Sequence, residues 1–260
     1  MSALAIHFHP HSLHRLMGDA KSIDPALLDT PELVALSKKK VKSDDDKAIL
    51  APLHARTLSA GAKMYLKEFA SEFLFGYHKV VETRVLDKGI QCEQMVIDLY
   101  NAVHFTRLAK NTERRVDEYL TGECDLHQPG KRTIDTKTCW DVSTFPILSE
   151  DCHDIAYEWQ GRAYMRLWDV PEHVVAFGLV DTPDSLIPAW EQAELHAVSH
   201  HAPNKRMTTI TYTRDLALEE LIVTKCKAGR AYLDKIISQF EREHNITPDW
   251  KNKFLQQPSP

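Results

Sequence analysis

The chain has 260 residues, of which 43% are hydrophobic and 27% charged, the composition of an ordinary globular protein. Its 32 basic residues stand against 37 acidic ones, so it is not a generally basic DNA-coating protein, and any contact with nucleic acid must come from a local patch. No apolar run reaches the length of a membrane span, and the amino terminus lacks the basic-then-apolar pattern of a signal sequence, so we expect a soluble, cytoplasmic protein without membrane contact.

Length and cysteine content narrow the class further. A chain of this size can bury a full core as one unit, and we predict a single domain over residues 1–260. The cysteines are odd in number and form no C-x-x-C pair, which indicates reduced thiols and argues against both a disulfide framework and an iron–sulfur site. They are Cys92, Cys124, Cys139, Cys152 and Cys226.

The amino-terminal segment is rich in histidine. His7, His9, His11 and His14 alternate around Phe8 and Pro10. A transition-metal site is one reading, but no cysteine or carboxylate lies nearby, and a surface strand running into a helix is favoured. Ser12 stands where a helix cap is expected, before Leu13 and Leu16, and a helix amino terminus can also bind phosphate. Plain capping is the simpler interpretation.

Two segments follow, one polar and one helical. Residues 22–46 are polar and are predicted to form a mobile loop with one short helix near residues 31–36. From Ser59 the apolar residues recur every three or four positions, which predicts a core helix capped by Ser59 and ending near Gly76.

A second helix is predicted to start near Lys88 and Gly89. Its apolar stripe includes Val96, Ile97 and Tyr100, and Glu93 falls on that stripe. Because an unpaired buried carboxylate is costly, Glu93 needs a cation, a metal ion or a hydrogen-bonding partner. A structural salt bridge would serve, but the acidic hairpin that follows favours a carboxylate directed at a metal ion.

The hairpin spans residues 122–138. Two short strands are predicted to meet at Pro129 and Gly130, where proline and glycine suit a tight turn. In the second strand Asp135 and Lys137 point to one face because they are two residues apart. Asp125 shares that face only if the loop holds an odd number of residues or the strand carries a bulge, and we predict an odd loop.

Two carboxylates and a lysine on one face suit metal-dependent hydrolysis of phosphodiester bonds. Carboxylate oxygens bind Mg²⁺ or Mn²⁺, and an ammonium group steadies the attacking water or the developing negative charge. For an isolated D-x-K sequence, a salt-bridged surface hairpin would be the better explanation. The neighbouring elements favour the catalytic one.

The remaining elements complete a mixed fold. Trp140, Phe145 and Pro146 suit the wall of a cleft. A third helix carries Gln160 and Tyr164 on one face, where a core glutamine bonded to backbone is the alternative. Residues 174–180 read as a central buried strand, and residues 207–213 as an edge or antiparallel strand. A long amphipathic helix or helix pair covers residues 216–240.

The order of these motifs resembles that of the PD-(D/E)XK nucleases. Four elements carry the resemblance: Gly89-x-x-x-Glu93 on a helix, Gly122-Glu123-Cys124-Asp125 on a strand, Asp135-Thr136-Lys137 on the next strand, and Gln160-x-x-x-Tyr164 on a helix. More narrowly, the chain is similar to the phage recombination exonucleases of the lambda-exonuclease and YqaJ type, over roughly residues 8–183. RecB-like nucleases share the last motif, but the closely spaced cysteines of several of them are absent here.

The resemblance implies a role for each motif residue. Glu93, Asp125, Asp135 and the Thr136 carbonyl would surround one or two divalent ions, and Lys137 would serve the nucleophilic water. Gln160 and Tyr164 would shape the site and contact the substrate strand. Ser12 and Arg15 would contact the 5′-phosphate, although the family usually has an arginine before the serine. Asp135 replaces the glutamate that many relatives have at its position.

We therefore predict a mixed α/β domain with a restriction-endonuclease-like core. A central mixed sheet of about four or five strands would be flanked by helices, with the core at about residues 59–183 and a carboxy-terminal strand and helices at residues 205–245. The expected function is a DNA exonuclease that depends on Mg²⁺ or Mn²⁺ and acts 5′ to 3′ on duplex ends. It would work in the cytoplasm of a bacterial cell, encoded by the host or by a phage. The resemblance also implies a single-strand annealing protein as partner and a homo-oligomeric ring.

Two alternatives stay open. One is a structure-specific or restriction-like endonuclease on the same core. The other is a non-catalytic nucleic-acid-binding protein that keeps the fold, whose signature would be the loss of an acidic ligand or of the lysine. None of these residues is lost in this sequence.

Overall fold

The structure is a computed structural model that describes residues 6–77 and 79–246. Its residues form two compact units. Unit 1 combines Met1–Phe8, Ser12–Lys79 and Ala217–Pro260, and unit 2 combines His9–His11 and Val80–Leu216. None of the described helices combines the length and the apolar character that crossing a membrane requires. All five cysteines are buried thiols.

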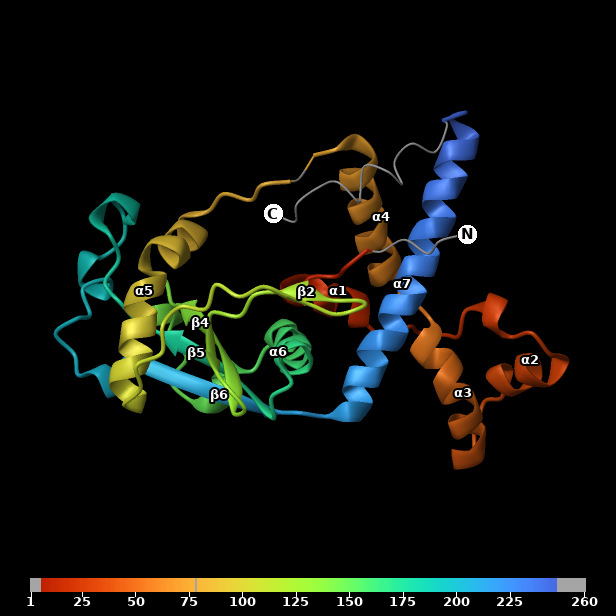
Figure 1. Ribbon diagram of the computed structural model, residues 1–260, viewed down its shortest axis with the longest axis horizontal. Coiled ribbons are helices and arrows are strands. Elements are labelled where there is room, and N and C mark those ends of the chain that lie inside the picture. Colours follow the sequence, from red (N-terminus) through yellow and green to blue (C-terminus); the bar gives the residue numbers. More distant parts are fainter. Residues whose placement is uncertain (1–5, 78, 247–260) are drawn as a thin grey trace. The chain divides into compact units, whose positions relative to one another are not determined.

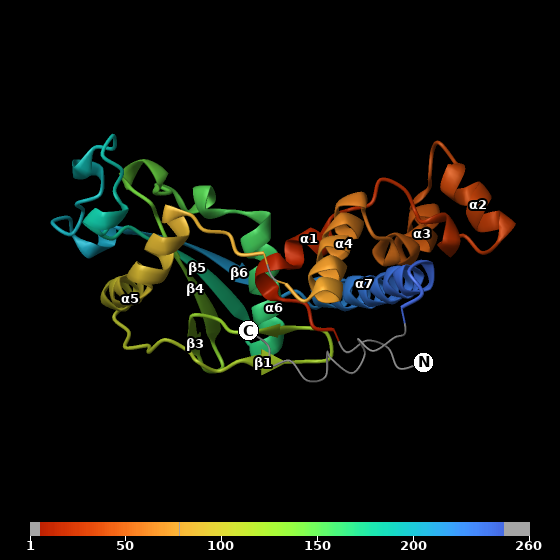
Figure 2. The same ribbon diagram turned by 90° about the horizontal axis from the view of Figure 1, so that it is seen from above.

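Unit 1 is helical (Figure 1). Its α-helices are α1 (Leu13–Met17), α2 (Pro31–Lys38), α3 (Asp44–Arg56), α4 (Ala60–Phe75) and α7 (Leu216–Glu243). The predicted ends of α4 are confirmed: the Ser59 hydroxyl accepts the Ala62 N–H at 3.1 Å, and Gly76 ends the helix at φ +65°. Figure 2 shows α4 beside α7, and Gly229 of α7 packs against Phe8 and Leu66.

The predicted loop over residues 22–46 is too long. Helix α2 fills residues 31–38, and the acidic run Asp44–Asp46 forms the first turn of α3. The Ser43 hydroxyl accepts the Asp46 N–H at 3.2 Å, and the Asp46 carboxylate accepts the Ser43 N–H at 2.8 Å. Carboxylates in a first turn also stabilise a helix, because the positive end of the helix dipole lies there. The acidic run therefore favours the start of a helix and not a loop.

Unit 2 is built on a mixed sheet. Its strands are β1 (Arg115–Val116), β2 (Thr121–Gly122), β3 (Leu126–Gln128), β4 (Arg132–Thr138), β5 (Glu172–Gly178) and β6 (Met207–Thr213). The main sheet has four strands in the order β3-β4-β5-β6, in which only β4 and β5 are parallel. Strands β1 and β2 form a separate small sheet. As predicted, β5 is central and β6 is an antiparallel edge strand.

Two helices cover the sheet on opposite sides (Figure 1). Helix α5 (Arg84–His104) packs Cys92, Val96 and Ile97 against the apolar face that carries Ile134, Val174 and Ala176. It starts at Arg84, four residues before the predicted start, because Thr83 caps it by accepting the Leu86 N–H at 3.2 Å. Helix α6 (Ile155–Trp168) covers the other face. The predicted mixed α/β fold is confirmed.

The β3–β4 hairpin has the predicted odd loop. Leu126 pairs with Ile134 and Gln128 with Arg132, which leaves the three residues 129–131 between the strands. Gly130 has φ +67°, a conformation that glycine adopts without strain. The first strand differs from the prediction, since β3 begins at Leu126, after Asp125, and Gly122 pairs in the small sheet instead.

Candidate active site

The hairpin brings two acidic residues and a lysine together. Leu126 pairs with Ile134, so extending this antiparallel register by one residue, back to Asp125 and forward to Asp135, sets the two acidic residues opposite each other. The Asp125 carboxylate accepts two hydrogen bonds from Thr136, from its N–H at 2.6 Å and from its hydroxyl at 2.8 Å. Lys137 Nζ lies 2.5 Å from Asp135 Oδ2. The carboxylates are therefore held in place by the strand that also carries the ammonium group.

Helix α6 adds two polar side chains to this group. Gln160 Oε1 accepts from Lys137 Nζ at 3.4 Å, and its Nε2 lies 3.5 Å from Asp135 Oδ1. One turn later, the Tyr164 hydroxyl donates to the Glu123 carbonyl at 2.9 Å. Gln160 thus contacts the side chains of the candidate site and is not a core glutamine bonded to backbone.

Burial shapes the charges of the group. Asp135 is only 4% exposed. Burial, and then the neighbouring Asp135 charge, raise the pKa of Asp125 to about 7. Burial lowers the pKa of Lys137, but the Asp135 carboxylate outweighs it and leaves that pKa above its usual value. Burial raises the pKa of Tyr164, so its hydroxyl stays neutral. Asp125 is therefore only partly ionised at neutral pH unless a cation joins the group.

His173 on β5 supports the helix from below. Its Nδ1 lies 2.9 Å from the Thr133 hydroxyl, and the ring packs directly beneath Gly161 of α6. Burial lowers the pKa of His173 to about 4, so the ring is neutral at physiological pH. This contact fixes the distance between α6 and the sheet, and therefore the positions of Gln160 and Tyr164 on that helix.

Glu93 has a partner that the sequence did not reveal. It is half-buried on α5, less enclosed than predicted, and forms an ion pair with Lys110. The hydrogen bond that Lys110 donates to the Glu93 carboxylate outweighs burial and raises the pKa of Lys110, and the charges of Asp125 and Glu123 add to this. The next residue, Asn111, donates its N–H to the Asp125 carbonyl at 2.7 Å. Lys110 thus links Glu93 to the acidic group, and no motif spacing marked it.

Ser12 and Arg15 lie in unit 1, where Ser12 immediately precedes α1 and Arg15 lies within it. The predicted cap is wrong, because the Ser12 side chain makes no capping hydrogen bond and instead meets the Tyr65 hydroxyl at 3.0 Å. Arg15 forms an ion pair with Glu68 at 2.6 Å and lies over the Tyr65 ring. Ser12 ends a 3-10 turn, Pro10–Ser12, that leads into the five-residue helix α1, and the Tyr65 hydroxyl is its side-chain partner in place of a helix N–H.

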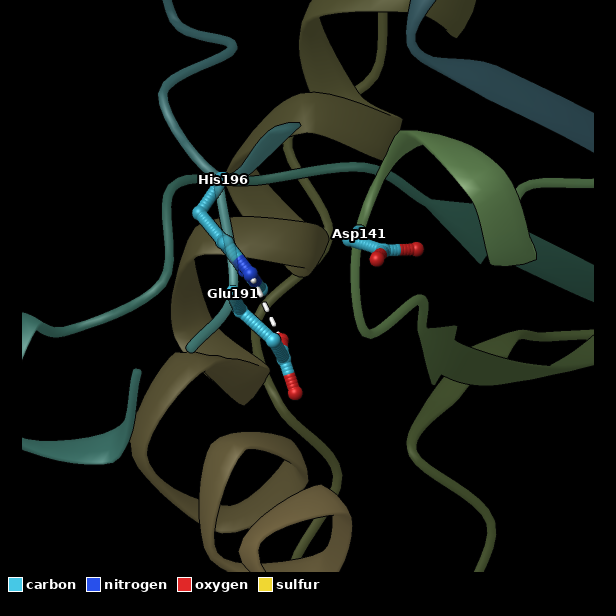
Figure 3. A group of neighbouring side chains, drawn as sticks. All are labelled: Asp141, Glu191 and His196. Carbon is cyan, nitrogen blue, oxygen red and sulfur yellow. Dashed lines mark hydrogen bonds and ion pairs between the residues drawn. The ribbon is translucent and has the colours of Figure 1, made fainter. Parts of the chain in front are cut away.

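A second cluster lies beyond the ends of β4 and β5 (Figure 3). One ligand atom each from Asp141, Glu191 and His196 lies within 4.8 Å of the other two, a spacing that could hold one metal ion. His196 Nε2 is 2.9 Å from Glu191, and its Nδ1 is 2.9 Å from the Thr182 hydroxyl. The three residues are spread over the sequence without motif spacing, so sequence reasoning missed them.

The predicted cleft wall has a packing role. Phe145 packs against a small core cluster formed by Cys139, Leu179 and Val198. Trp140 donates its indole N–H to Glu191 at 2.9 Å and contacts the His196 ring edge-on. Phe145 therefore fills core space, and Trp140 contacts two members of the second cluster.

Comparisons with known proteins place the chain among exonuclease folds. No protein-family model and no curated protein matches the chain. Among solved structures, it is similar to a phage-related exonuclease from Haemophilus somnus 129PT, with 30% identity and a TM-score of 0.74, covering 91% of this chain and 97% of that one.

Two more distant structures share the fold. One is an alkaline exonuclease, LHK-Exo, from Laribacter hongkongensis, with 12% identity and a TM-score of 0.58 over 94% of this chain and 95% of that one. The other is LHK-Exo in complex with dAMP, with 14% identity and a TM-score of 0.55 over 74% of this chain and 89% of that one.

Proposed function

The chain belongs to the phage-type exonucleases of the lambda-exonuclease and YqaJ kind, within the PD-(D/E)XK nucleases, and we propose that it hydrolyses DNA from duplex ends with a divalent metal ion. The observation that carries the proposal is the group of Asp125, Asp135 and Lys137 at the β3–β4 hairpin, in which Thr136 holds Asp125 and Gln160 contacts both Asp135 and Lys137. From family membership alone we also propose the 5′ to 3′ direction and a role in phage-type recombination.

The donor set fits a divalent ion. Asp125 is half-buried beside the buried Asp135, and the Asp135 charge adds to burial in raising the pKa of Asp125, so a divalent cation between the two would favour the ionised form of both. Carboxylate oxygens are the ligands that Mg²⁺ and Mn²⁺ prefer. We assign Asp125, Asp135 and the Thr136 carbonyl as ligands, with Glu93 as a further one. A bound ion would polarise the scissile phosphate and lower the pKa of a water molecule.

The chain's own residues supply the rest of the chemistry. Thr136 fixes the Asp125 carboxylate through two hydrogen bonds. The Lys137 ammonium, held by Asp135 and Gln160, can orient the nucleophilic water or stabilise negative charge in the transition state. The neutral Tyr164 hydroxyl anchors the backbone at Glu123 and, with Gln160, is assigned to the substrate strand.

Digestion of end-labelled linear duplex tests the proposal. We expect release of mononucleotides with Mg²⁺, none with EDTA, and none from the Asp135→Asn variant under either condition. Covalently closed circular DNA should resist degradation. Cutting of the circle at the rate of the linear duplex would favour the endonuclease alternative, and binding without cleavage would favour the non-catalytic one.

The 5′-phosphate needs its own test, because Ser12 and Arg15 already have partners in Tyr65 and Glu68. If they also serve the terminal phosphate, 5′-phosphorylated duplex is degraded faster than 5′-hydroxyl duplex, and Ser12→Ala narrows the difference. Equal rates in the parent protein would reject the assignment. The annealing partner and the ring are proposed from the family alone, and gel filtration with light scattering tests the ring.

A further inference from the structure

Unit 1 contains a cavity of about 490 Å³ between α3 and α7. Leu50, Ala51 and Leu221 provide apolar surface, and Lys42, Lys47, His54 and Lys225 provide basic groups. Asp19 is the one carboxylate among the described lining residues. Cavities of this size accommodate small ligands. The lining favours a ligand that carries negative charge.

Lys225 is the most informative residue of this cavity. It is 2% exposed, and its ammonium donates to the Thr57 carbonyl at 2.6 Å. An ammonium group has three N–H donors, and the Thr57 carbonyl is the single hydrogen-bond acceptor for Lys225 within residues 6–77 and 79–246. A buried cation with donors to spare is costly unless an anion meets it. Burial lowers the pKa of Lys225, and Asp19 only partly offsets this.

Two more lysines stand at the cavity. Lys42 Nζ donates to the Lys39 carbonyl at 2.7 Å, so its hydrogen bond involves no counter-charge. Lys47 pairs with Asp44 at 2.8 Å, but both side chains are largely exposed, and exposed pairs are weak. Both ammonium groups are therefore available to an incoming anion.

We propose that this cavity binds a phosphate group, with Lys225 as its buried anchor and Lys42 and Lys47 as rim contacts. Lysine ammonium groups bind phosphate as point charges. The phosphate can come from a nucleoside 5′-monophosphate, whose base would meet the apolar wall, or from the backbone of a DNA strand. The site is separate from the hairpin group, and the proposal does not depend on that group being catalytic.

The test uses the full chain carrying Asp135→Asn, in EDTA, so that cleavage and metal binding at the hairpin are absent. Melting temperature and calorimetric titration are measured with inorganic phosphate, with dAMP and with a short single-stranded oligonucleotide that has no terminal phosphate. We expect phosphate or dAMP to raise the melting temperature by roughly 2–4 °C at about ten times Kd. In Lys225→Met the affinity should fall at least about tenfold.

Lys67→Met is the matched control, because Lys67 is exposed on α4 and does not line the cavity. It should bind like the Asp135→Asn parent. If Lys225→Met does not fold, the rim variant Lys42→Ala/Lys47→Ala replaces it, with the same expected loss. Binding of dAMP but not of the oligonucleotide identifies a monoester site, and equal loss of both identifies a backbone site.

Two results would overturn the proposal. One is that none of the three probes shifts the melting temperature, and the other is that Lys225→Met and the rim variant both respond as the parent does. Neither result affects the proposed nuclease activity, which is measured separately in the chain with Asp135 intact.

Discussion

Gly161 of α6 lies so close to His173 of β5 that a Cβ atom at position 161 would come within 2.3 Å of His173 Cδ2. No real side chain tolerates that distance, and the fully buried imidazole cannot swing away. Helix α6 can therefore approach β5 only because residue 161 is glycine.

Replacing this glycine should be costly. Gly161→Ala gains about 1 kcal/mol of helix propensity, yet we expect a net loss of about 1–2 kcal/mol in the free energy of unfolding, because α6 must rise off the sheet. Denaturant unfolding measures this. Gly89→Ala in α5 is the control, since a Cβ there meets nothing within 4 Å, and it should stabilise by about 0.5–1 kcal/mol. Equal effects of the two variants would contradict the close contact.

His173 should make the protein sensitive to mild acid. Its folded pKa of about 4 lies below the usual 6.5, so its neutral form contributes stability above pH 6.5 that is lost as the pH falls from 6.5 towards 4. The loss approaches about 1.4 kcal/mol per pH unit in that window. Unfolding at pH 7 and pH 5 should show a smaller difference for His173→Asn than for the parent. The exposed His200→Asn should change nothing.

Asp135 and Lys137 should separate metal binding from the water step. Asp135→Asn should abolish cleavage, and Lys137→Met should lower turnover by roughly 10²-fold, the scale of losing one placed electrostatic group. Each change removes one partner of the buried Asp135–Lys137 ion pair, so both variants should stay folded but melt below the parent temperature without metal. Lys131→Met, in the loop of the same hairpin, should cleave normally. Single-turnover digestion measures these cleavage rates. If either Asp135→Asn or Lys137→Met cleaves at the parent rate, the hairpin has a structural role and not a catalytic one.

Lys110 should compete with the metal ion. Because its ammonium pairs with Glu93 and lies in the field of Asp125, it neutralises charge that the ion would otherwise meet. Lys110→Met should therefore lower the Mg²⁺ concentration at half-maximal activity, by about three- to tenfold for an effect of 0.7–1.4 kcal/mol. A higher Mg²⁺ requirement would mean that Lys110 positions Glu93 for the ion.

Local rules predicted the part of the site that lies on the hairpin. Strand alternation sets Asp135 and Lys137 on one face, and the odd loop sets Asp125 opposite Asp135. Each of these needs only neighbouring positions of one element or one turn, which are written directly in the sequence. Helical spacing gives only that Gln160 and Tyr164 share a face of one helix, and the family resemblance implied that Gln160 lies at the site.

Contacts between elements distant in the sequence were not predictable in this way. The Glu93–Lys110 pair joins a helix to an irregular segment, and Gly161–His173 joins a helix to a strand that follows it. Their partners depend on how the elements pack, for which periodicity gives no distance. The Ser12 cap failed for the same reason, since the competing Tyr65 hydroxyl comes from α4.

The discontinuity of unit 1 has a consequence for biosynthesis. Its early helices leave the ribosome well before α7, because the Val80–Leu216 part of unit 2 is translated between them. Until Gly229 arrives, the apolar surfaces of Phe8, Leu16 and Leu66 lack their α7 neighbour. The nascent chain is thus expected to expose a chaperone-binding surface throughout translation of unit 2, and a ribosome-bound chain stalled near residue 216 should be cut readily by protease within its first 79 residues.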